Sequence, residues 1–216
     1  MTDVFDGLFD RFDRANAGFE RRLRLVRTEQ WAWPTPCPDW DVRRLVNHMA
    51  RGNLDYARLV QGGSAGEFLR LRDADALGDD PLGAFARSAR TCAAAFAAPG
   101  AMDREVDYPL GAIGARQAFA VRITDAAVHT WDLARAIGAD DLLDTDLVAW
   151  IDAHLARIYA TLRESPTSAD TTHRFFGAPD GTPPDGASRQ ARLLHRMGRT
   201  DAGAPPAADR ADGTRR

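Results

Sequence analysis

The sequence predicts an all-α protein, a bundle of four main helices with short additional helices and a loop-rich C-terminal region. Apolar residues recur at spacings of three, four and seven over several long segments, which is the pattern of amphipathic helices with one buried face. Helix start and stop residues flank these segments, with aspartate or proline at the beginnings and glycine or proline after the ends. The chain has no internal repeat, so a repeat architecture is not expected.

The first two helices are predicted on either side of a proline-rich connection. The first covers about 4–26, where one face carries Phe5, Leu8, Phe9, Phe12, Phe19, Leu23 and Val26. The segment WAWPTPCPDW at 31–40 cannot be helical, because proline lacks the amide hydrogen that a helix uses. The second helix begins after Asp41, a good N-cap residue, and ends before the glycines at 62–63.

Three further long helices and one short helix are predicted downstream. The region 64–80 is polar, with at most a helical turn at 67–71, and a helix follows at 81–98 with proline in its first turn. The region 101–114 is expected to be irregular, with a short extended piece at 104–108. Helices are then expected over 115–137, closed by Gly138, and from Asp144 onward, with a short helix at 187–197.

Length, charge and composition limit the class of protein. The 216 residues suggest one domain over 1–199 and a tail at 200–216, which has almost no apolar side chains and is expected to be disordered. No apolar run reaches the ~18 residues that span a bilayer, and a net charge of −3 with scattered arginines argues against nucleic-acid binding. Two cysteines fit a reduced compartment. We therefore expect a cytoplasmic protein without nucleic-acid or membrane partners, either a monomer or a homodimer.

A polar stripe runs along the otherwise apolar helix predicted at 115–137. Arg122, Asp125, His129 and Asp132 follow a 3-4-3 spacing and therefore share one helix face. The pattern alone leaves two interpretations open: the stripe faces solvent, or it forms a polar site inside the protein. An Asp-x-x-x-His pair can present an oxygen and a nitrogen to one metal ion, but two such ligands need a third from elsewhere.

His48 is the candidate for that third ligand. It lies in the middle of the second predicted helix, beside the apolar stripe. A lone histidine in such a position is more often a packed residue than a ligand, so the spacing by itself does not decide its role. The remaining histidines, His154, His173 and His195, fit the pattern less well because they fall at a helix flank or in the less regular C-terminal region.

Two long blocks of sequence resemble a known family. PTPCPDWDVRRLVNHM at 34–49 and DAAVHTWDLARAIGAD at 125–140 are similar to the DinB-like superfamily, and more closely to the metal-binding N-terminal domain of mycothiol-dependent maleylpyruvate isomerases. The resemblance runs from about 9 to 198 and includes FAAPGAMDREVDYPLG, HRFFGAP and ARLLHRMGR. All 28 basic residues are arginine, which is typical of a GC-rich genome and compatible with the actinobacteria that make mycothiol.

The resemblance implies a divalent metal, usually zinc, held by a histidine on the second helix and an acidic-x-x-x-His pair on a later one. Carried over by position, the ligands are His48, Asp125 and His129. The isomerases have glutamate at the acidic position, where this chain has the shorter Asp125. They also carry a further C-terminal domain for which this chain has too little ordered sequence, so it resembles a short single-domain member whose reaction need not be maleylpyruvate isomerisation.

The function that this resemblance implies is a metal-dependent thiol transferase or isomerase. Mycothiol or a similar low-molecular-weight thiol would be held as thiolate and would attack a small electrophilic substrate. The alternatives are a non-catalytic metal-binding structural or regulatory module, a maleylpyruvate cis-trans isomerase, and a bundle that has lost its metal.

Three further side chains receive candidate roles. Arg122 either neutralises a substrate carboxylate or forms a structural ion pair with Asp125 or Asp132. Asp132 either orients a ligand histidine or pairs with Arg135. Cys37 lies between two prolines with no histidine near it in sequence, so a buried structural thiol is preferred to a nucleophile.

Overall fold

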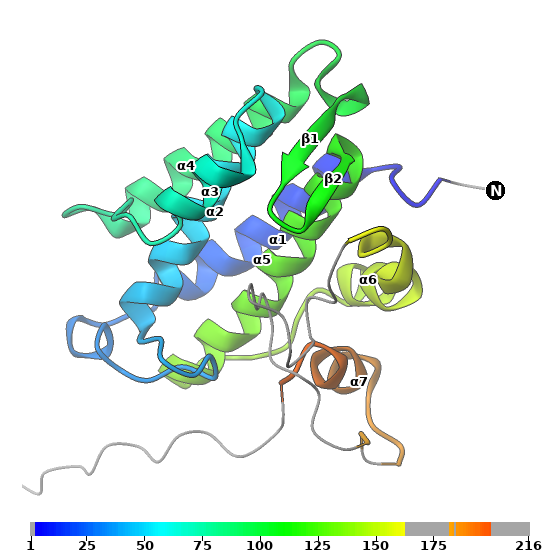
Figure 1. The fold of residues 1–216 in the computed structure, drawn as a ribbon. Helices are drawn as coiled ribbons and strands as arrows, with labels where there is room; N and C mark the ends of the chain where they lie inside the picture. Colours follow the sequence, from blue (N-terminus) through cyan, green and yellow to red (C-terminus); the bar gives the residue numbers. More distant parts are fainter. Residues whose placement is uncertain (1–2, 163–181, 184, 200–216) are drawn as a thin grey trace, which may run out of the picture.

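Four long helices form the body of the protein. The computed structural model describes residues 3–162, 182–183 and 185–199. The long helices are α1 (Leu8–Leu23), α2 (Val42–Val60), α4 (Pro81–Ala97) and α5 (Ala115–Ile137). α2 packs against α4 and α5, and α1 packs against α5 and α4 (Figure 1). The all-α class predicted from apolar spacing is therefore confirmed.

Shorter elements cover the ends of this body. They are α3 (Ala65–Leu71), α6 (Thr145–Ile158), α7 (Arg189–Arg196), two 3₁₀ turns at Thr28–Gln30 and Ala101–Asp103, and the strands β1 (Glu105–Tyr108) and β2 (Gly111–Gly114). α6 and α7 pack against each other at one end of the molecule (Figure 1). The tail at 200–216, expected to be disordered, lies outside the described residues.

The region 101–114 is more regular than predicted: the extended piece expected at 104–108 is β1, whereas β2 was not expected. β1 and β2 form an antiparallel hairpin in which Val106 pairs with Ile113 and Tyr108 with Gly111. β1 buries Val106 and Tyr108, and β2 spans only four residues, which is too short to stand out in the sequence. Gly111, at a φ of 120°, adopts a backbone conformation that other residues rarely take, and so permits the turn.

Several helices begin or end at the capping residues that the sequence indicates. Asp41 accepts a hydrogen bond from the Arg44 amide at the start of α2, and Asp144 caps α6 in the same way. Gly138 ends α5 in the left-handed conformation, at a φ of 69°. α1 is shorter than the predicted 4–26, because Gly7 is also left-handed, at a φ of 67°, and the helix begins only after it.

α5 is the central helix and is buried on all sides. Twenty of its 23 residues are buried, so its polar side chains face the interior rather than solvent. Phe119 on α5 stacks on Phe12 of α1 and on Phe96 of α4, with ring centroids 4.7 Å and 4.3 Å apart. These contacts join three of the long helices around one aromatic cluster.

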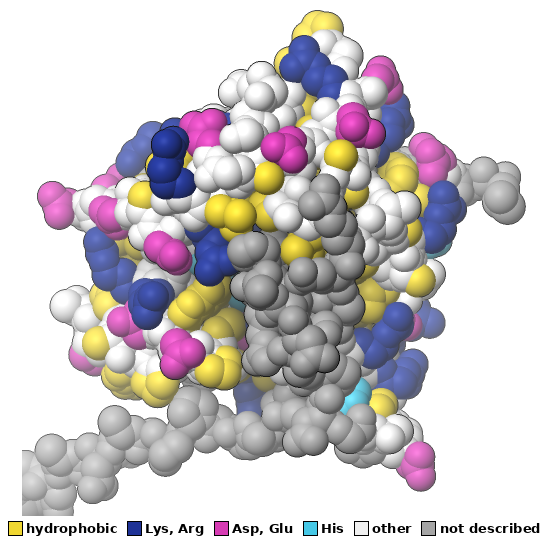
Figure 2. Space-filling model, viewed as in Figure 1, with side chains coloured by type: hydrophobic (Ala, Val, Ile, Leu, Met, Phe, Trp, Pro, Cys, Tyr) yellow, Lys and Arg dark blue, Asp and Glu magenta, His cyan; other side chains and the backbone are white. Residues whose placement is uncertain are grey.

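The surface carries charges of both signs. Basic and acidic side chains are intermixed over the face in Figure 2, without a large area of one sign. No helix within the described ranges combines the length and apolar character that crossing a membrane requires.

We expect Phe119→Ala to destabilise the protein by about 3–5 kcal/mol, because it leaves a cavity among three helices. Phe9→Ala is the matched control: its ring also contacts Phe119, but 38% of the residue is exposed, so its loss costs much less. Urea unfolding of the two variants measures the difference. Equal destabilisation would contradict the central role of Phe119.

Candidate metal centre

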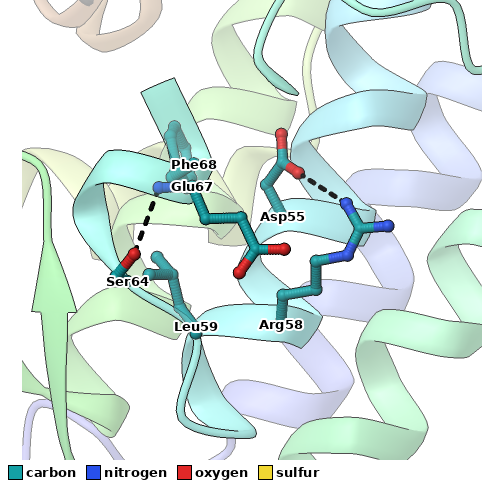
Figure 3. Close-up of a pocket in the computed structure, with 7 residues that line it drawn as sticks. Asp55, Arg58, Leu59, Ser64, Glu67 and Phe68 are labelled. Carbon is teal, nitrogen blue, oxygen red and sulfur yellow. Dashed lines mark hydrogen bonds and ion pairs between the residues drawn. The ribbon is translucent and has the colours of Figure 1, made fainter. Parts of the chain in front are cut away.

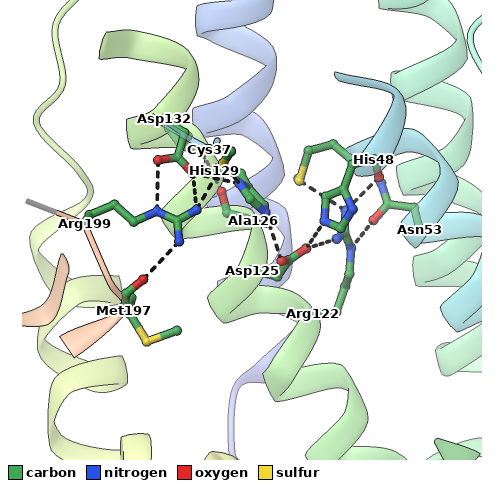
Figure 4. A network of polar contacts seen from close by, with 12 residues as sticks. Cys37, His48, Asn53, Arg122, Asp125, Ala126, His129, Asp132, Met197 and Arg199 are labelled. Atoms are coloured by element: carbon green, nitrogen blue, oxygen red, sulfur yellow. Dashed lines mark hydrogen bonds and ion pairs between the residues drawn. The ribbon is translucent and has the colours of Figure 1, made fainter. Parts of the chain in front are cut away.

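Three side chains from two helices converge on one point in the interior. His48 Nε2 lies 3.2 Å from Asp125 Oδ2, and His129 Nε2 lies 3.2 Å from Asp125 Oδ1. One donor atom from each residue can be chosen so that all three lie within 4.8 Å of one another. Figure 4 shows the histidine from α2 and the Asp-His pair of α5 facing each other. Two imidazole nitrogens and one carboxylate oxygen are a donor set that suits zinc.

The polar stripe of α5 therefore lies inside the protein. Asp125 is 6% exposed and His129 is 1% exposed, whereas His48 is half-buried beside them. The Trp40 ring lies against both imidazoles, with its centroid 4.7 Å from that of His48 and 5.7 Å from that of His129. An aromatic ring in this position covers one side of the candidate centre.

Arg122 supports Asp125 from the turn before it. Its guanidinium forms an ion pair with Asp125 Oδ2, one of the two roles that the sequence left open. The other nitrogens donate to Asn53 Oδ1 at 2.8 Å and to the Met49 carbonyl at 2.7 Å. A role toward a substrate carboxylate stays a prediction, and it would require one of these bonds to be exchanged.

Gly52 provides the space that this guanidinium occupies. A Cβ atom at Gly52 would lie 2.9 Å from Arg122 NH1, closer than real side chains approach. The guanidinium cannot easily retreat, because its nitrogens are bonded to α2 and to Asp125. The absence of a side chain at Gly52 is therefore required for the contact between α2 and α5.

Asp132 holds the far side of the His129 ring. Its Oδ2 lies 2.8 Å from His129 Nδ1, so it can accept a hydrogen bond there and orient the ring with Nε2 toward Asp125 Oδ1, which is 3.2 Å away. Asp132 in turn forms two bonds with Arg199, at 3.1 Å and 2.6 Å. Arg135, the partner considered from sequence, bonds Asp141.

Arg199 and Cys37 complete this network. Arg199 donates to the Met197 carbonyl at 2.9 Å and contacts Cys37 Sγ at 3.2 Å. Cys37 is buried, as expected, and donates to Asp132 Oδ2 at 3.3 Å. Its sulfur also lies 3.8 Å from His129 Nδ1, a proximity that sequence distance concealed. Both cysteines are free thiols.

Burial and neighbouring charges have opposite effects on the pKa values of Asp125 and Asp132. Burial alone would raise the pKa of Asp125, but His129, His48 and Arg122 outweigh it and hold that pKa well below its usual value. Burial likewise opposes ionisation of Asp132, yet Arg199 and His129 lower its pKa. The pKa of His48 is lowered by burial. Both carboxylates are therefore anionic at neutral pH, and His48 favours the neutral form that binds metals. Burial would lower the pKa of His129, but Asp125 and Asp132 outweigh it and raise that pKa, so a metal ion would displace a proton from this ring.

A cavity of about 380 Å³ opens beside the three candidate ligands, which all line it. This volume is in the range of small-molecule sites. The segment 64–80, which the sequence showed only to be polar, contributes Phe68, Arg72 and Asp73 to the wall of the cavity. The segment 101–114 supplies no lining residue among those described; its Tyr108 is hydrogen-bonded to Tyr56, which lines the cavity. A narrow groove next to it is lined by Asp55, Arg58, Leu59, Gly63, Ser64, Glu67 and Phe68 (Figure 3).

Sequence reasoning missed Arg199 and Asn53. Arg199 lies 67 residues after Asp132, and Asn53 lies 69 residues before Arg122, so no local spacing connects them. For Asn53, the sequence offered one signal: a polar side chain on the apolar face of α2. His154 and His195 do not line the cavity, and His173 lies outside the described residues.

Comparison with known proteins assigns the family. Residues 12–134 match the family model described as mycothiol maleylpyruvate isomerase N-terminal domain, which covers more than half of the chain. The chain belongs to this family. The matched range includes all three candidate ligands and ends before Arg199, so that contact comes from a part of the chain that the family model does not describe.

The chain also resembles one bacterial protein in sequence and two solved structures in fold. An uncharacterized protein of Mycobacterium tuberculosis, found in strains H37Rv and CDC 1551, is 32% identical over 134 residues, which are 62% of this chain and 69% of the relative. The crystal structure of mycothiol-dependent maleylpyruvate isomerase superposes with a TM-score of 0.55 at 18% identity, and that of a histidine-to-alanine variant with 0.56 at 17%. Each covers 72% of both chains, which shows a shared fold.

We expect Gly52→Ala to displace Arg122 and to destabilise the protein by about 1–3 kcal/mol through overpacking. Gly18→Ala is the control, since its Cβ would meet Thr130 at an ordinary 3.7 Å and alanine favours the helix. Thermal unfolding of both variants tests the contact. A Gly52→Ala protein as stable as the wild type would show that the guanidinium has room to move.

We expect Arg199→Met to weaken metal binding about 10–100-fold, because Asp132 loses its cation and His129 loses its fixed orientation. Arg196→Met is the nearby control, at the last residue of α7: it removes an exposed ion pair with Asp152. Metal affinity is measured by competition with a chromophoric chelator. Equal affinities in the two variants would exclude a positioning role for Arg199.

Proposed function

We propose that the protein is a metal-dependent thiol transferase or isomerase that uses mycothiol or a similar low-molecular-weight thiol. The observation that carries the proposal is the convergence of His48, Asp125 and His129 at the wall of a cavity large enough for a small molecule. Three protein ligands with an open side are the arrangement of a catalytic centre rather than a structural one, which closes around its ion with four.

The proposed ligands would hold a divalent ion, and zinc suits them. When bound, that ion would supply the stabilisation that keeps a thiol ionised at neutral pH. Asp125 is shorter than the glutamate that the family resemblance implies, and Arg122 holds it in place against α2. His129 is oriented by Asp132, which turns its Nε2 toward Asp125 on the side of the proposed centre.

Three other side chains that line the cavity, Trp40, Arg122 and Arg199, would favour nucleophilic attack by the thiolate. The Trp40 ring shields the two imidazoles from water on one side, which strengthens electrostatic interactions inside. The thiolate sulfur would form a bond to an electrophilic carbon. In an activated alkene, the displaced electron pair would move to the conjugated carbonyl oxygen. The buried Arg122 and Arg199 line the same cavity, and their positive charge would stabilise the negative charge that develops on that oxygen.

Elemental analysis of the purified protein tests the centre. We expect about one equivalent of divalent metal in the wild type and in His154→Ala, whose histidine is outside the cavity. We expect His48→Ala and His129→Ala to retain little, because two ligands hold an ion much less firmly than three. Equal metal content in all four proteins would overturn the assignment.

Incubation of the metal-loaded protein with mycothiol and a panel of electrophiles tests catalysis. The panel contains maleylpyruvate, an epoxide and an alkyl halide, and mass spectrometry detects thioether products or isomerised substrate. Turnover that disappears in His129→Ala supports the proposal. Bound metal without turnover of any electrophile would instead indicate a non-catalytic metal-binding module.

A further inference from the structure

A second set of metal-binding atoms lies on the other side of the His129 ring. This second donor set consists of Cys37 Sγ, His129 Nδ1 and Asp132 Oδ2, which all lie within 4.8 Å of one another. Figure 4 shows the three side chains gathered beside the guanidinium of Arg199. The proposed centre uses Nε2 of the same ring, and the thiol chemistry proposed above gives none of these three atoms a ligand role.

The spacing of the second donor set suits one tetrahedral ion. Asp132 Oδ2 lies 2.8 Å from His129 Nδ1 and 3.3 Å from Cys37 Sγ, and the sulfur lies 3.8 Å from the ring nitrogen. The ligand atoms of a tetrahedral zinc ion, at its usual bond lengths, are roughly 3.3–3.6 Å apart. Sub-ångström movements of the side chains therefore bring all three atoms to bonding distance from one ion.

A cation already lies against the second donor set. Arg199 NH2 is 2.6 Å from Asp132 Oδ2 and 3.2 Å from Cys37 Sγ, so the guanidinium occupies the side on which an ion would bind. A buried carboxylate needs such a positive partner. A divalent ion brings one more positive charge than the guanidinium, and ionisation of the Cys37 thiol on binding balances that charge.

The guanidinium can leave this position without unfolding the helix before it. α7 is held by the buried side chains of Leu193 and Leu194, whereas Arg199 follows the end of the helix. Arg199 and Cys37 both line the cavity. An ion in the cavity can therefore reach the sulfur as the guanidinium turns away from Asp132.

The donor types define the class of ion and its affinity. Sulfur, an imidazole nitrogen and one carboxylate oxygen suit zinc or cobalt, whereas magnesium and calcium require oxygen ligands. A His129 ring that binds one ion through Nε2 and another through Nδ1 must lose both of its protons. That cost and the displacement of Arg199 make the second ion the weaker one, so the purified protein would retain only the first.

We propose that Cys37, His129 and Asp132 form a second, weaker site for a divalent ion of the zinc class, which Arg199 closes as a competing internal cation. Binding of the ion breaks the Arg199–Asp132 ion pair and releases the Cys37 thiol proton and the remaining His129 ring proton to solvent. Metal in excess of one equivalent would thereby detach the Arg199 side chain from the centre. The site does not rest on the proposed function, because no thiol substrate takes part in it.

Stepwise titration of the full chain with Co²⁺, in the absence of added thiols, tests the second site. Cobalt bound to a thiolate absorbs in the near ultraviolet, whereas an ion held by His48, Asp125 and His129 has no sulfur ligand and lacks this band. We expect the wild type to bind one ion without the band and a second, at least tenfold more weakly, with it. A pH-stat should record about two protons released with the second ion.

Three variants identify the ligands and the competing cation. Cys37→Ser should bind the first ion within about twofold of the wild type but lose the band and at least tenfold in affinity for the second. Cys92→Ala is the matched control, because that buried thiol does not line the cavity, and it should keep both ions. Arg199→Met should bind the second ion at least tenfold more tightly; its first centre is weakened, so the thiolate band is the quantity compared. Circular dichroism verifies that each variant is folded.

Each outcome decides the second site. A band that depends on Cys37 and saturates at lower Co²⁺ in Arg199→Met supports it. The site is overturned if the wild type and Arg199→Met both saturate without the band, if Cys37→Ser retains the band, or if Arg199→Met binds the second ion no more tightly. A Cys37-dependent band that forms with the first equivalent and is unchanged in His48→Ala would support the Cys37 site and overturn the proposed function.

Discussion

The buried charges of α5 determine how the rest of the molecule is arranged. A carboxylate removed from water is tolerated only if its charge is balanced and its oxygens accept hydrogen bonds. α5 buries Asp125 and Asp132, and each has one arginine: Arg122 from the same helix and Arg199 from the residues after α7. The His129 imidazole lies between the two carboxylates, and His48 contacts Asp125 from α2. The candidate metal centre is thus part of a charge network that the fold must complete.

This network explains several features that look unrelated. Gly52 lacks a side chain because Arg122 occupies the space beside α2, and Asn53 is polar because it accepts from the same guanidinium. The proline-rich connection brings Cys37 against Asp132 and Trp40 against the imidazoles. These residues come from two segments, α2 and the proline-rich connection, and both segments pack against the polar stripe on α5 or its arginine.

Much of the architecture could be read from the sequence because it depends on local patterns. The bounds of α5 follow from continuous apolar residues ended by glycine, and Asp41 and Asp144 mark helix starts through their capping chemistry. Helical spacing placed Arg122, Asp125, His129 and Asp132 on one face, and the family resemblance supplied His48. Spacing could not decide whether that face was buried, because burial depends on the packing of other helices.

The remaining features depend on contacts between distant segments. Arg199 reaches Asp132 and Cys37 through the docking of α7, which no periodicity in the sequence reports. The extended piece at 104–108 was expected, but β2 and its pairing with β1 were missed because a four-residue strand flanked by glycines carries too little pattern. The second donor set is likewise visible only once the proline-rich connection is seen to place Cys37 against His129 and Asp132.

The contact between Arg199 and Cys37 has a consequence for the order of assembly. The two residues are 162 positions apart, and closing so long a loop carries a large entropic cost before any contact offsets it. α1, α4 and α5 can associate through the aromatic cluster around Phe119 without this contact. The imidazole of His129 is therefore fixed late in folding, after synthesis has reached the end of α7, and it is among the first groups released when that end detaches.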